Sequence, residues 1–244
     1  MPSGTHPPRV PPGRRLYAVG DIHGRADLLS RLLAEIATDA KCRGPAQNRL
    51  VYLGDYVDRG PDSADVIDLV LDGAPAGFDG VTLMGNHEDM MRRFLFDLTI
   101  GRGWLMNGAD ATLRSYGVEP PTPHDDTQAY RRASVELAQH LPPRHRRFLD
   151  SLALSHEEGD YFFVHAGVRP GVPLAEQRPE DLVWIRDEFL ESDAEFGKRV
   201  VHGHSITREP TFRHNRIGID TGAYATGRLT CLVLEGSDWA LLQT

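Results

Sequence analysis

Three short polar blocks follow apolar runs within the first ninety residues, and they constrain the fold more than any other feature of the chain. The blocks are Gly-Asp-Ile-His-Gly at 20–24, Gly-Asp-Tyr-Val-Asp-Arg-Gly at 54–60 and Gly-Asn-His-Glu at 85–88. Strand ends on one rim of an α/β sheet bring such loops together. Carboxylate, imidazole and amide groups are ligands of divalent metals. The pattern therefore predicts a metal cluster, suited to hydrolysis, at the rim of a sheet.

Each block lies between a short apolar run and a segment with apolar residues at helical spacing. The runs cover 16–19, 50–53 and 81–84, and the helical patterns cover 28–36, 66–71 and 90–98. Strands that are apolar throughout, alternating with amphipathic helices, indicate an α/β fold with a sheet buried on both faces. The segment 101–124 is rich in Gly, Pro and Asn, a composition typical of a structured excursion rather than of a core element. Helical patterning returns at 130–140 and 144–152.

Two further apolar runs, in the second half of the chain, also end in histidine. The run 161–164 ends at His165-Ala166-Gly167, and the run 199–201 ends at His202-Gly203-His204. The C-terminus predicts short strands over 217–219, 229–234 and 239–242, the last two joined by a hairpin-like turn. Five blocks that carry Asp, Asn or His thus follow expected strands.

Length and composition indicate one globular domain. The chain has 244 residues with 40% hydrophobic content, which is enough for one buried core, and we expect a single domain over residues 14–244. Residues 1–13 contain five prolines and no apolar stretch of the signal-peptide kind, so we expect a disordered lead there. No run approaches the length of about 18 apolar residues that a membrane helix requires.

Charge and cysteine content argue against several classes of partner. The 27 basic and 35 acidic residues give a net charge of −8, the wrong sign for holding a nucleic acid backbone by bulk electrostatics. Cys42 and Cys231 are the only cysteines, and their wide separation predicts neither a disulfide framework nor a thiolate zinc site. We therefore expect a cytoplasmic protein with no nucleic acid or membrane partner. The oligomeric state stays open.

Each block taken alone also has an ordinary structural explanation. An Asp-x-His pair on a loop is more often a surface turn than a ligand set, and Asp27 or Asp62 could cap the helix that follows such a turn. Five blocks of the same kind at strand ends are difficult to explain as independent turns. Their joint occurrence favours a metal site.

The blocks resemble the motifs of the phosphoprotein phosphatase family, a branch of the calcineurin-like metallophosphoesterases. Blocks 54–60 and 85–88 together are similar to the serine/threonine phosphatase branch, and 104–117 and 165–171 are similar to its compact bacterial members. The resemblance implies a four-layer α/β/β/α sandwich with a two-metal site at the C-terminal ends of strands. One departure is Ala166, at a place where eukaryotic members usually have glycine.

The same resemblance implies two divalent ions bridged by Asp55. Mn²⁺ is the expected ion from bacterial relatives, and Fe and Zn share its ligand preferences. Two such ions would activate a bridging water for direct attack on phosphorus, without a phosphoenzyme. The other protein ligands would be Asp21 and His23 at one ion, and Asn86, His165 and His204 at the other.

Four further residues would act on the phosphate, again by resemblance. His87 would protonate the leaving oxygen and Asp58 would hold His87 in place. Arg59 would bind two phosphate oxygens as a fork, and Arg186 would supply a second guanidinium. His202 is expected to be structural, and Asp220 to form a turn beneath the site.

The sequence thus predicts a metal-dependent phosphomonoesterase, and a serine/threonine protein phosphatase is the favoured hypothesis, with activity on phosphotyrosine left open. Its substrates would be phosphoproteins or phosphopeptides, and small phosphomonoesters in vitro. The alternative is a diadenosine tetraphosphate hydrolase, because that family shares Gly-Asp-x-His-Gly and Gly-Asn-His. It usually departs from the Val-Asp-Arg-Gly of 57–60 and from Glu88. A third hypothesis, an inactive phosphate-binding relative, is disfavoured because all the implied ligands are present.

Overall fold

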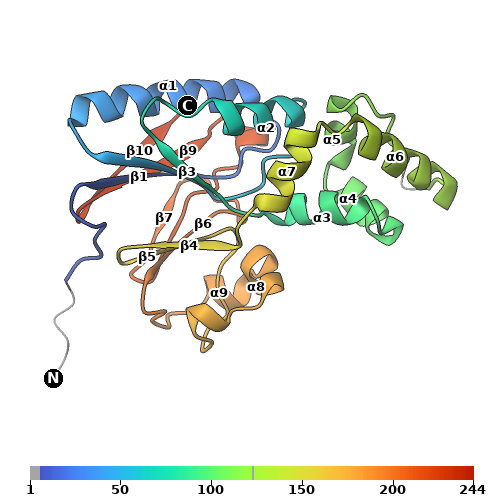
Figure 1. Cartoon of the computed structure of the whole chain (residues 1–244). Coiled ribbons are helices and arrows are strands. Elements are labelled where there is room, and N and C mark those ends of the chain that lie inside the picture. The colour runs from blue at the N-terminus through green and yellow to red at the C-terminus, as the bar shows by residue number, and fades with distance from the viewer. Residues whose placement is uncertain (1–5, 123) are drawn as a thin grey trace.

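In the computed structural model, two five-stranded sheets lie face to face with helices on both outer faces (Figure 1). The structure describes residues 6–122 and 124–244. The first sheet has the order β10-β9-β1-β2-β3 and the second the order β4-β5-β6-β8-β7. The strands of the first are β1 (Arg14–Val19), β2 (Gln47–Tyr52), β3 (Asp79–Thr82), β9 (Thr230–Glu235) and β10 (Asp238–Gln243). Those of the second are β4 (Ser155–Glu158), β5 (Tyr161–Val164), β6 (Arg199–His202), β7 (Thr211–Phe212) and β8 (Arg216–Gly218).

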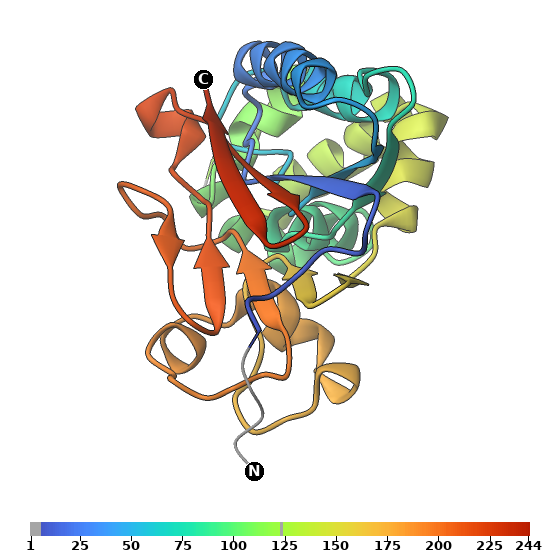
Figure 2. The same cartoon turned by 90° about the vertical axis from the view of Figure 1, so that its left-hand side faces the viewer.

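The strands that lead into the polar blocks are parallel within each sheet. β1 pairs with β2 and β2 with β3 in one sheet, while β5 pairs with β6 and β6 with β8 in the other. The C-terminal hairpin of β9 and β10, red in Figure 2, runs antiparallel beside β1. Parallel strands have their C-terminal ends at the same edge, so the five blocks leave the two sheets at edges that can face each other.

Alternate residues of the central strands enter different cores, which explains why these strands are apolar throughout. Leu16 and Ala18 of β1 face the second sheet, whereas Tyr17 and Val19 join the core beneath the helices. Strand β5 repeats the pattern, since Phe163 lies between the sheets and its neighbours Phe162 and Val164 contact the helices outside the second sheet. Side chains of a strand alternate between its two faces. The predicted sheet buried on both faces, and the four-layer sandwich, are confirmed.

Helices cover the outer faces and one end of the sandwich (Figure 1). Helices α1 and α2 lie over the first sheet, α8 and α9 lie beneath the second, and α3 to α7 gather at the end where the blocks emerge. Their bounds are α1 (Ala26–Arg43), α2 (Ser63–Asp72), α3 (Asn86–Phe94), α4 (Gly101–Met106), α5 (Ala109–Ser115), α6 (Thr127–His140), α7 (Pro143–Ser151), α8 (Pro179–Trp184), α9 (Asp187–Leu190) and α10 (Ala223–Thr226). Two 3₁₀ turns cover Leu98–Ile100 and Leu174–Glu176.

The segment 101–124 is not the excursion that its composition suggested. It forms α4 and α5, and Trp104, Ala109 and Leu113 are fully buried in the core beneath the helices. The two helices have only 6 and 7 residues, too few turns for an apolar period to be visible in the sequence. Its glycines lie at helix ends and within a short helix. In the sequence such glycines look the same as the glycines of a loop.

In the described part of the proline-rich segment, Arg9 and Val10 contact the body of the fold. Val10 is buried, its backbone N–H donates to the carbonyl of Gly236 at 2.8 Å, and the N–H of Arg9 donates to the Asp160 carboxylate at 2.8 Å. The disorder expected for residues 1–5 lies outside the described residues. A single domain over 14–244 stays a prediction. Among the described residues, none of the helices combines the length and hydropathy needed to cross a membrane.

Candidate active site

Backbone strain is concentrated in the polar blocks. Five residues are the only non-glycine positions with positive φ in the described parts of the chain, with values between 48° and 73°. Such conformations cost free energy and persist where the surrounding structure enforces them, often at functional sites. All five belong to the predicted site: His23, Asp55, Asp58, Arg59 and His204.

Glycines in the blocks allow the carboxylates to approach the backbone closely. A Cβ added at Gly85 would lie 2.1 Å from Oδ1 of Asp55, and one at Gly203 would lie 2.0 Å from Oδ1 of Asp21. Both distances are far below van der Waals contact. Any larger residue at either place would displace a predicted metal ligand.

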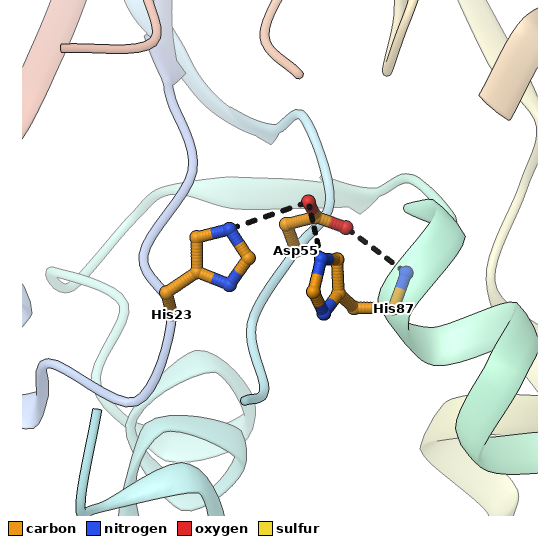
Figure 3. Close-up of side chains that lie close together, drawn as sticks. All are labelled: His23, Asp55 and His87. Carbon is orange, nitrogen blue, oxygen red and sulfur yellow. Dashed lines mark hydrogen bonds and ion pairs between the residues drawn. The ribbon is translucent and has the colours of Figure 1, made fainter. Parts of the chain in front are cut away.

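Asp55 lies at the centre of the site, between two groups of ligand atoms. One oxygen, Oδ2, is 3.4 Å from Nε2 of His23 and 3.8 Å from Nε2 of His87 (Figure 3). The other, Oδ1, is 3.4 Å from Nε2 of His165. In each of the groups His23–Asp55–His87 and Asp55–His165–His204, the ligand atoms lie within 4.8 Å of one another. A carboxylate placed in this way can bridge two cations.

Hydrogen bonds set the tautomers of two histidines so that their free nitrogens face Asp55. The Nδ1–H of His23 donates to the Val57 carbonyl at 2.9 Å, and that of His165 donates to the Leu53 carbonyl at 2.9 Å. Burial lowers the pKa of His23 to about 3 and lowers the pKa of His165, so both rings are neutral near pH 7. A neutral imidazole with its second nitrogen hydrogen-bonded is the form that binds metals.

Asn86 and His204 meet at His165, and Asp21 lies beside the backbone of His204. Oδ1 of Asn86 is 3.0 Å from Nε2 of His165, and Nδ1 of His204 is 3.2 Å from the same atom. Asp21 accepts the backbone N–H of His204 through Oδ2, while its Oδ1 and Nε2 of His204 have no hydrogen-bond partner among the residues described. Buried polar atoms are rarely left without a partner. The oxygen and imidazole set therefore fits divalent cations of the Mn, Fe or Zn kind.

His87 is held by Asp58 with a short contact. Its Nδ1 lies 2.6 Å from Oδ2 of Asp58, and both side chains are buried. Burial opposes the charged ring, but the Asp55 charge and the Asp58 hydrogen bond outweigh it and raise the pKa of His87. The sequence-based analysis gave no role to the groups that hold Asp58: Trp104 Nε1–H donates at 2.7 Å and Thr112 Oγ1–H donates at 2.5 Å. The resemblance of 104–117 pointed to this segment, but not to these contacts.

The two predicted arginines lie at different ligand groups. The Arg59 guanidinium has one nitrogen 3.0 Å from Nε2 of His23 and the other 3.3 Å from Nε2 of His87. Its central carbon lies 4.7 Å above the ring of Tyr224, a residue that no sequence pattern singled out. Arg186 is exposed and donates to the backbone carbonyl of His204 at 3.4 Å. Each arginine thus lies beside a residue of a different group of predicted ligands.

Glu88 joins the second block to the third. Its buried carboxylate accepts the backbone N–H groups of Asp55, Tyr56, Val57 and Gly85, at 2.8–3.2 Å. The sequence-based analysis used Glu88 to compare families and missed this structural role.

Two secondary expectations can be compared with the structure. Asp220 accepts the N–H of Gly222 at 2.9 Å, as expected of a turn, and buried His202 contacts the Gly203 carbonyl at 3.0 Å. Asp62 occupies the N-cap position of α2, as the alternative expected, but its side chain makes no capping hydrogen bond, and the N-cap of α1 is Arg25 and not Asp27.

Comparisons with known proteins agree with this geometry. A bis(5'-nucleosyl)-tetraphosphatase PrpE [asymmetrical] of Bacillus mycoides (strain KBAB4) is 27% identical over 224 residues, which cover 88% of each chain. A symmetrical bis(5'-nucleosyl)-tetraphosphatase of Dechloromonas aromatica (strain RCB) is 34% identical over 155 residues, 63% of this chain and 44% of that one. A crystal structure of a candidate diadenosine tetraphosphatase shares the fold, with a TM-score of 0.63, 22% identity and 98% of each chain covered.

These relatives do not support the predicted assignment to the serine/threonine protein phosphatase branch, because the curated relatives reported above are named as nucleosyl-tetraphosphatases. They do support the larger group, whose members are metal-dependent hydrolases. The family model described as calcineurin-like phosphoesterase matches residues 14–231. By fold, by the Asp and His groups around Asp55, and by this match, the chain belongs to the calcineurin-like phosphoesterase family.

Proposed function

We propose that this protein hydrolyses dinucleoside tetraphosphates with the help of two divalent metal ions. The observation that carries the proposal is the likeness, along 88% of the chain, to a protein named as a bis(5'-nucleosyl)-tetraphosphatase. This reverses the ranking that the sequence motifs suggested. Those motifs favoured a protein phosphatase through Glu88 and the Val-Asp-Arg-Gly of 57–60, but Glu88 binds backbone amides and Arg59 lies beside the proposed ligand His23. Neither residue selects between a protein and a nucleotide.

The proposed ligands are Asp55 as the bridge, with Asp21 and His23 at one ion and Asn86, His165 and His204 at the other. Their support is convergence on one place, neutral histidines and buried atoms that lack a partner. Bound divalent ions supply Lewis-acid activation of the phosphoryl group and of water. We propose Mn²⁺ as the native ion.

The remaining roles concern charge and proton transfer. Arg59 and Arg186 would bind phosphate oxygens on either side of the bridge, and a polyphosphate chain carries enough negative charge to engage both. His87, held by Asp58 at 2.6 Å, would donate the proton from Nε2 to the leaving phosphate oxygen. The geometry of the Asp58 contact supports this role because it leaves Nε2 facing Asp55.

A protein phosphatase remains the second candidate. Blocks 54–60 and 85–88 resemble that branch, and phosphoprotein hydrolysis would need the same ions, arginines and acid. The two hypotheses differ in the group attached to phosphorus: a nucleoside through a polyphosphate chain, or an amino acid side chain.

The deciding experiment compares kcat/KM for diadenosine tetraphosphate with kcat/KM for phosphoserine and phosphotyrosine peptides. The enzyme is first stripped with a chelator and then loaded with Mn²⁺, Fe²⁺ or Zn²⁺, and Asp55→Asn serves as the inactive control. We expect the nucleotide to be preferred and Mn²⁺ to restore activity. A preference for a phosphopeptide would overturn the proposal. No turnover of any of these substrates with any of the metals would exclude both hypotheses.

A further inference from the structure

A cavity of about 490 Å³ lies between α3 and α8. Met84, two residues before Asn86, belongs to its wall together with Leu152, Leu154 and Val183. Small-molecule sites are commonly cavities of about 300–1,000 Å³ with apolar walls and a few polar groups. The cavity has the size and lining of such a site, and none of the roles assigned above uses it.

Trp184 connects this cavity to the active site. Its ring meets the ring of His204 nearly edge to face, at 85° with the centroids 6.2 Å apart. The side chain also lines the cavity, and the residue is 40% exposed. An exposed indole face beside a cavity is a surface on which a flat aromatic group can stack.

The rim of the cavity carries both positively and negatively charged side chains. Arg92 and Arg93 of α3 lie opposite Glu180 of α8, with Asp89 beside Arg93. The ion pairs Arg92–Asp150 and Arg93–Asp89 are both long, at 3.5 Å, and each arginine is at least a third exposed. Donors and acceptors are therefore both available around an apolar interior. A nucleobase has the matching form, with apolar faces and an edge of donors and acceptors.

We infer that this cavity binds one nucleobase of the dinucleotide substrate, with Trp184 stacking on the base. The inference rests on the proposed function, which supplies the nucleotide. It also fits the position of the cavity, because a base is joined to its 5'-phosphate through a single ribose, and the Trp184 ring lies 6.2 Å from the ring of the proposed ligand His204. An apolar side chain of a phosphopeptide is the competing occupant.

The inference is tested by calorimetric titration of the metal-loaded enzyme with two ligands. Both carry a ribose phosphate, and only one carries a base. Adenosine 5'-monophosphate carries the base and ribose 5-phosphate does not. We expect the first to bind about 5- to 150-fold more tightly, the range that base stacking on an aromatic side chain provides. Trp184→Ala should bring this ratio to within about twofold of one, whereas Trp184→Phe should retain most of it.

Trp239→Ala is the matched control. Trp239 is also exposed, at 52%, but it stacks on Phe212 in the hairpin region and does not line this cavity. Its removal should leave the ratio unchanged. The metal content of each variant is measured in parallel, because Trp184 contacts the ring of a predicted ligand.

The outcomes separate this inference from the proposed function. A ratio near one in the wild-type enzyme, or one unaffected by Trp184→Ala, would overturn the subsite even if diadenosine tetraphosphate is hydrolysed. A high ratio that depends on Trp184 would support the subsite even if the dinucleotide proves a poor substrate. Weaker binding of a phosphopeptide to Trp184→Ala, with no change for the nucleotide, would assign the cavity to a peptide.

Discussion

His87 contacts two carboxylates at once, and this placement determines what the residue can do. Nδ1 is engaged by Asp58 at 2.6 Å, so that only Nε2 is directed toward Asp55 and the phosphate site. Because His87 belongs to one of the two groups of ligand atoms, its geometry alone also permits a role as a metal ligand. A single substitution separates the two roles.

We predict that His87→Asn lowers kcat by about 10²–10⁴-fold, the usual contribution of general acid–base catalysis, with metal content unchanged. The loss should be larger with phenyl phosphate than with p-nitrophenyl phosphate, because the more basic phenolate needs the proton more. Steady-state kinetics and elemental analysis of the purified variant provide the measurement. Loss of one metal equivalent would instead make His87 a ligand.

At the scale of elements, α4 and α5 hold Asp58 in place from outside the sheets. Trp104 of α4 and Thr112 of α5 donate to the two oxygens of Asp58 at 2.7 Å and 2.5 Å, across sequence separations of 46 and 54 residues. The helices therefore do more than complete the core. They orient the carboxylate that orients His87.

Trp104→Phe tests this link, because it keeps an apolar ring in the core while it removes the Nε1–H donor together with part of the buried indole. We expect kcat to fall about 10- to 100-fold, as is usual when the partner of a site residue is lost. Trp239→Phe makes the same change far from the site and should be neutral. Activity is normalised to folded protein by circular dichroism. Equal activity of Trp104→Phe and wild type would show that Thr112 alone is enough.

The turn before α3 allows a matched pair of glycine substitutions. Gly85→Ala would place a Cβ 2.1 Å from Oδ1 of Asp55, whereas a Cβ at Gly80, in β3, has no atom within 4 Å. We predict that Gly85→Ala loses metal and activity, because Asp55 must move, and that Gly80→Ala retains both. Metal content by elemental analysis and kcat/KM are compared. Normal metal binding by Gly85→Ala would contradict the argument that this approach requires glycine.

On the scale of the whole molecule, the site joins the two sheets. Asp21, His23, Asp55 and Asn86 follow strands of the first sheet, while His165 and His204 follow strands of the second. Ions held between these residues would crosslink the sandwich. Folding and metal binding should therefore be coupled.

We predict that Mn²⁺ raises the melting temperature of the chelator-treated protein. Binding to the folded state alone contributes about 2.7 kcal/mol of stability when the free ion is at 100 times its Kd. Scanning calorimetry over a range of Mn²⁺ concentrations measures the shift, and Asp55→Asn is the control in which most of it should disappear. A melting temperature independent of the ion would argue against metal binding between the sheets.

A second contact between distant parts of the chain lies in the first sheet, away from the site. Buried Arg15 of β1 binds Glu235 of β9 there through two hydrogen bonds of 2.8 and 2.9 Å. The Arg15 hydrogen bond lowers the pKa of Glu235 below its ordinary 4.5. A lowered folded-state pKa means that the pair stabilises fully above about pH 4.5, and that this stability is lost as pH falls through the folded-state value.

Glu235→Gln should therefore reduce the free energy of unfolding near pH 7 by about 1 kcal/mol, a value discounted because Glu235 is partly exposed. The difference from wild type should shrink near pH 3. Urea titrations at both pH values measure it, and Glu209→Gln, in an exposed pair with Arg228, should have little effect. An equal difference at both pH values would show that the charge of Glu235 is not the cause.

The sequence by itself determined the layered α/β architecture and the identity of most of the residues that meet at Asp55. Both follow from short-range patterns: apolar strands, amphipathic helices, and glycine-flanked ligands at strand ends. Where the pattern was short, as in α4 and α5, the prediction was wrong, because one or two helical turns show no period. The packing of Val10 was missed for a related reason, since one apolar residue among prolines gives no periodic signal.

Only the tertiary structure decided which groups surround those ligands. The donors to Asp58 come from helices about fifty residues away, Tyr224 reaches Arg59 from the other end of the chain, and Trp184 places a cavity beside His204. Such contacts depend on how whole elements are oriented against each other, which no local period encodes. We therefore expect the choice of substrate to depend on these surroundings rather than on the shared ligands. This is why the motifs at 20–24, 54–60 and 85–88 identified a phosphoesterase but ranked its substrates differently from the relatives.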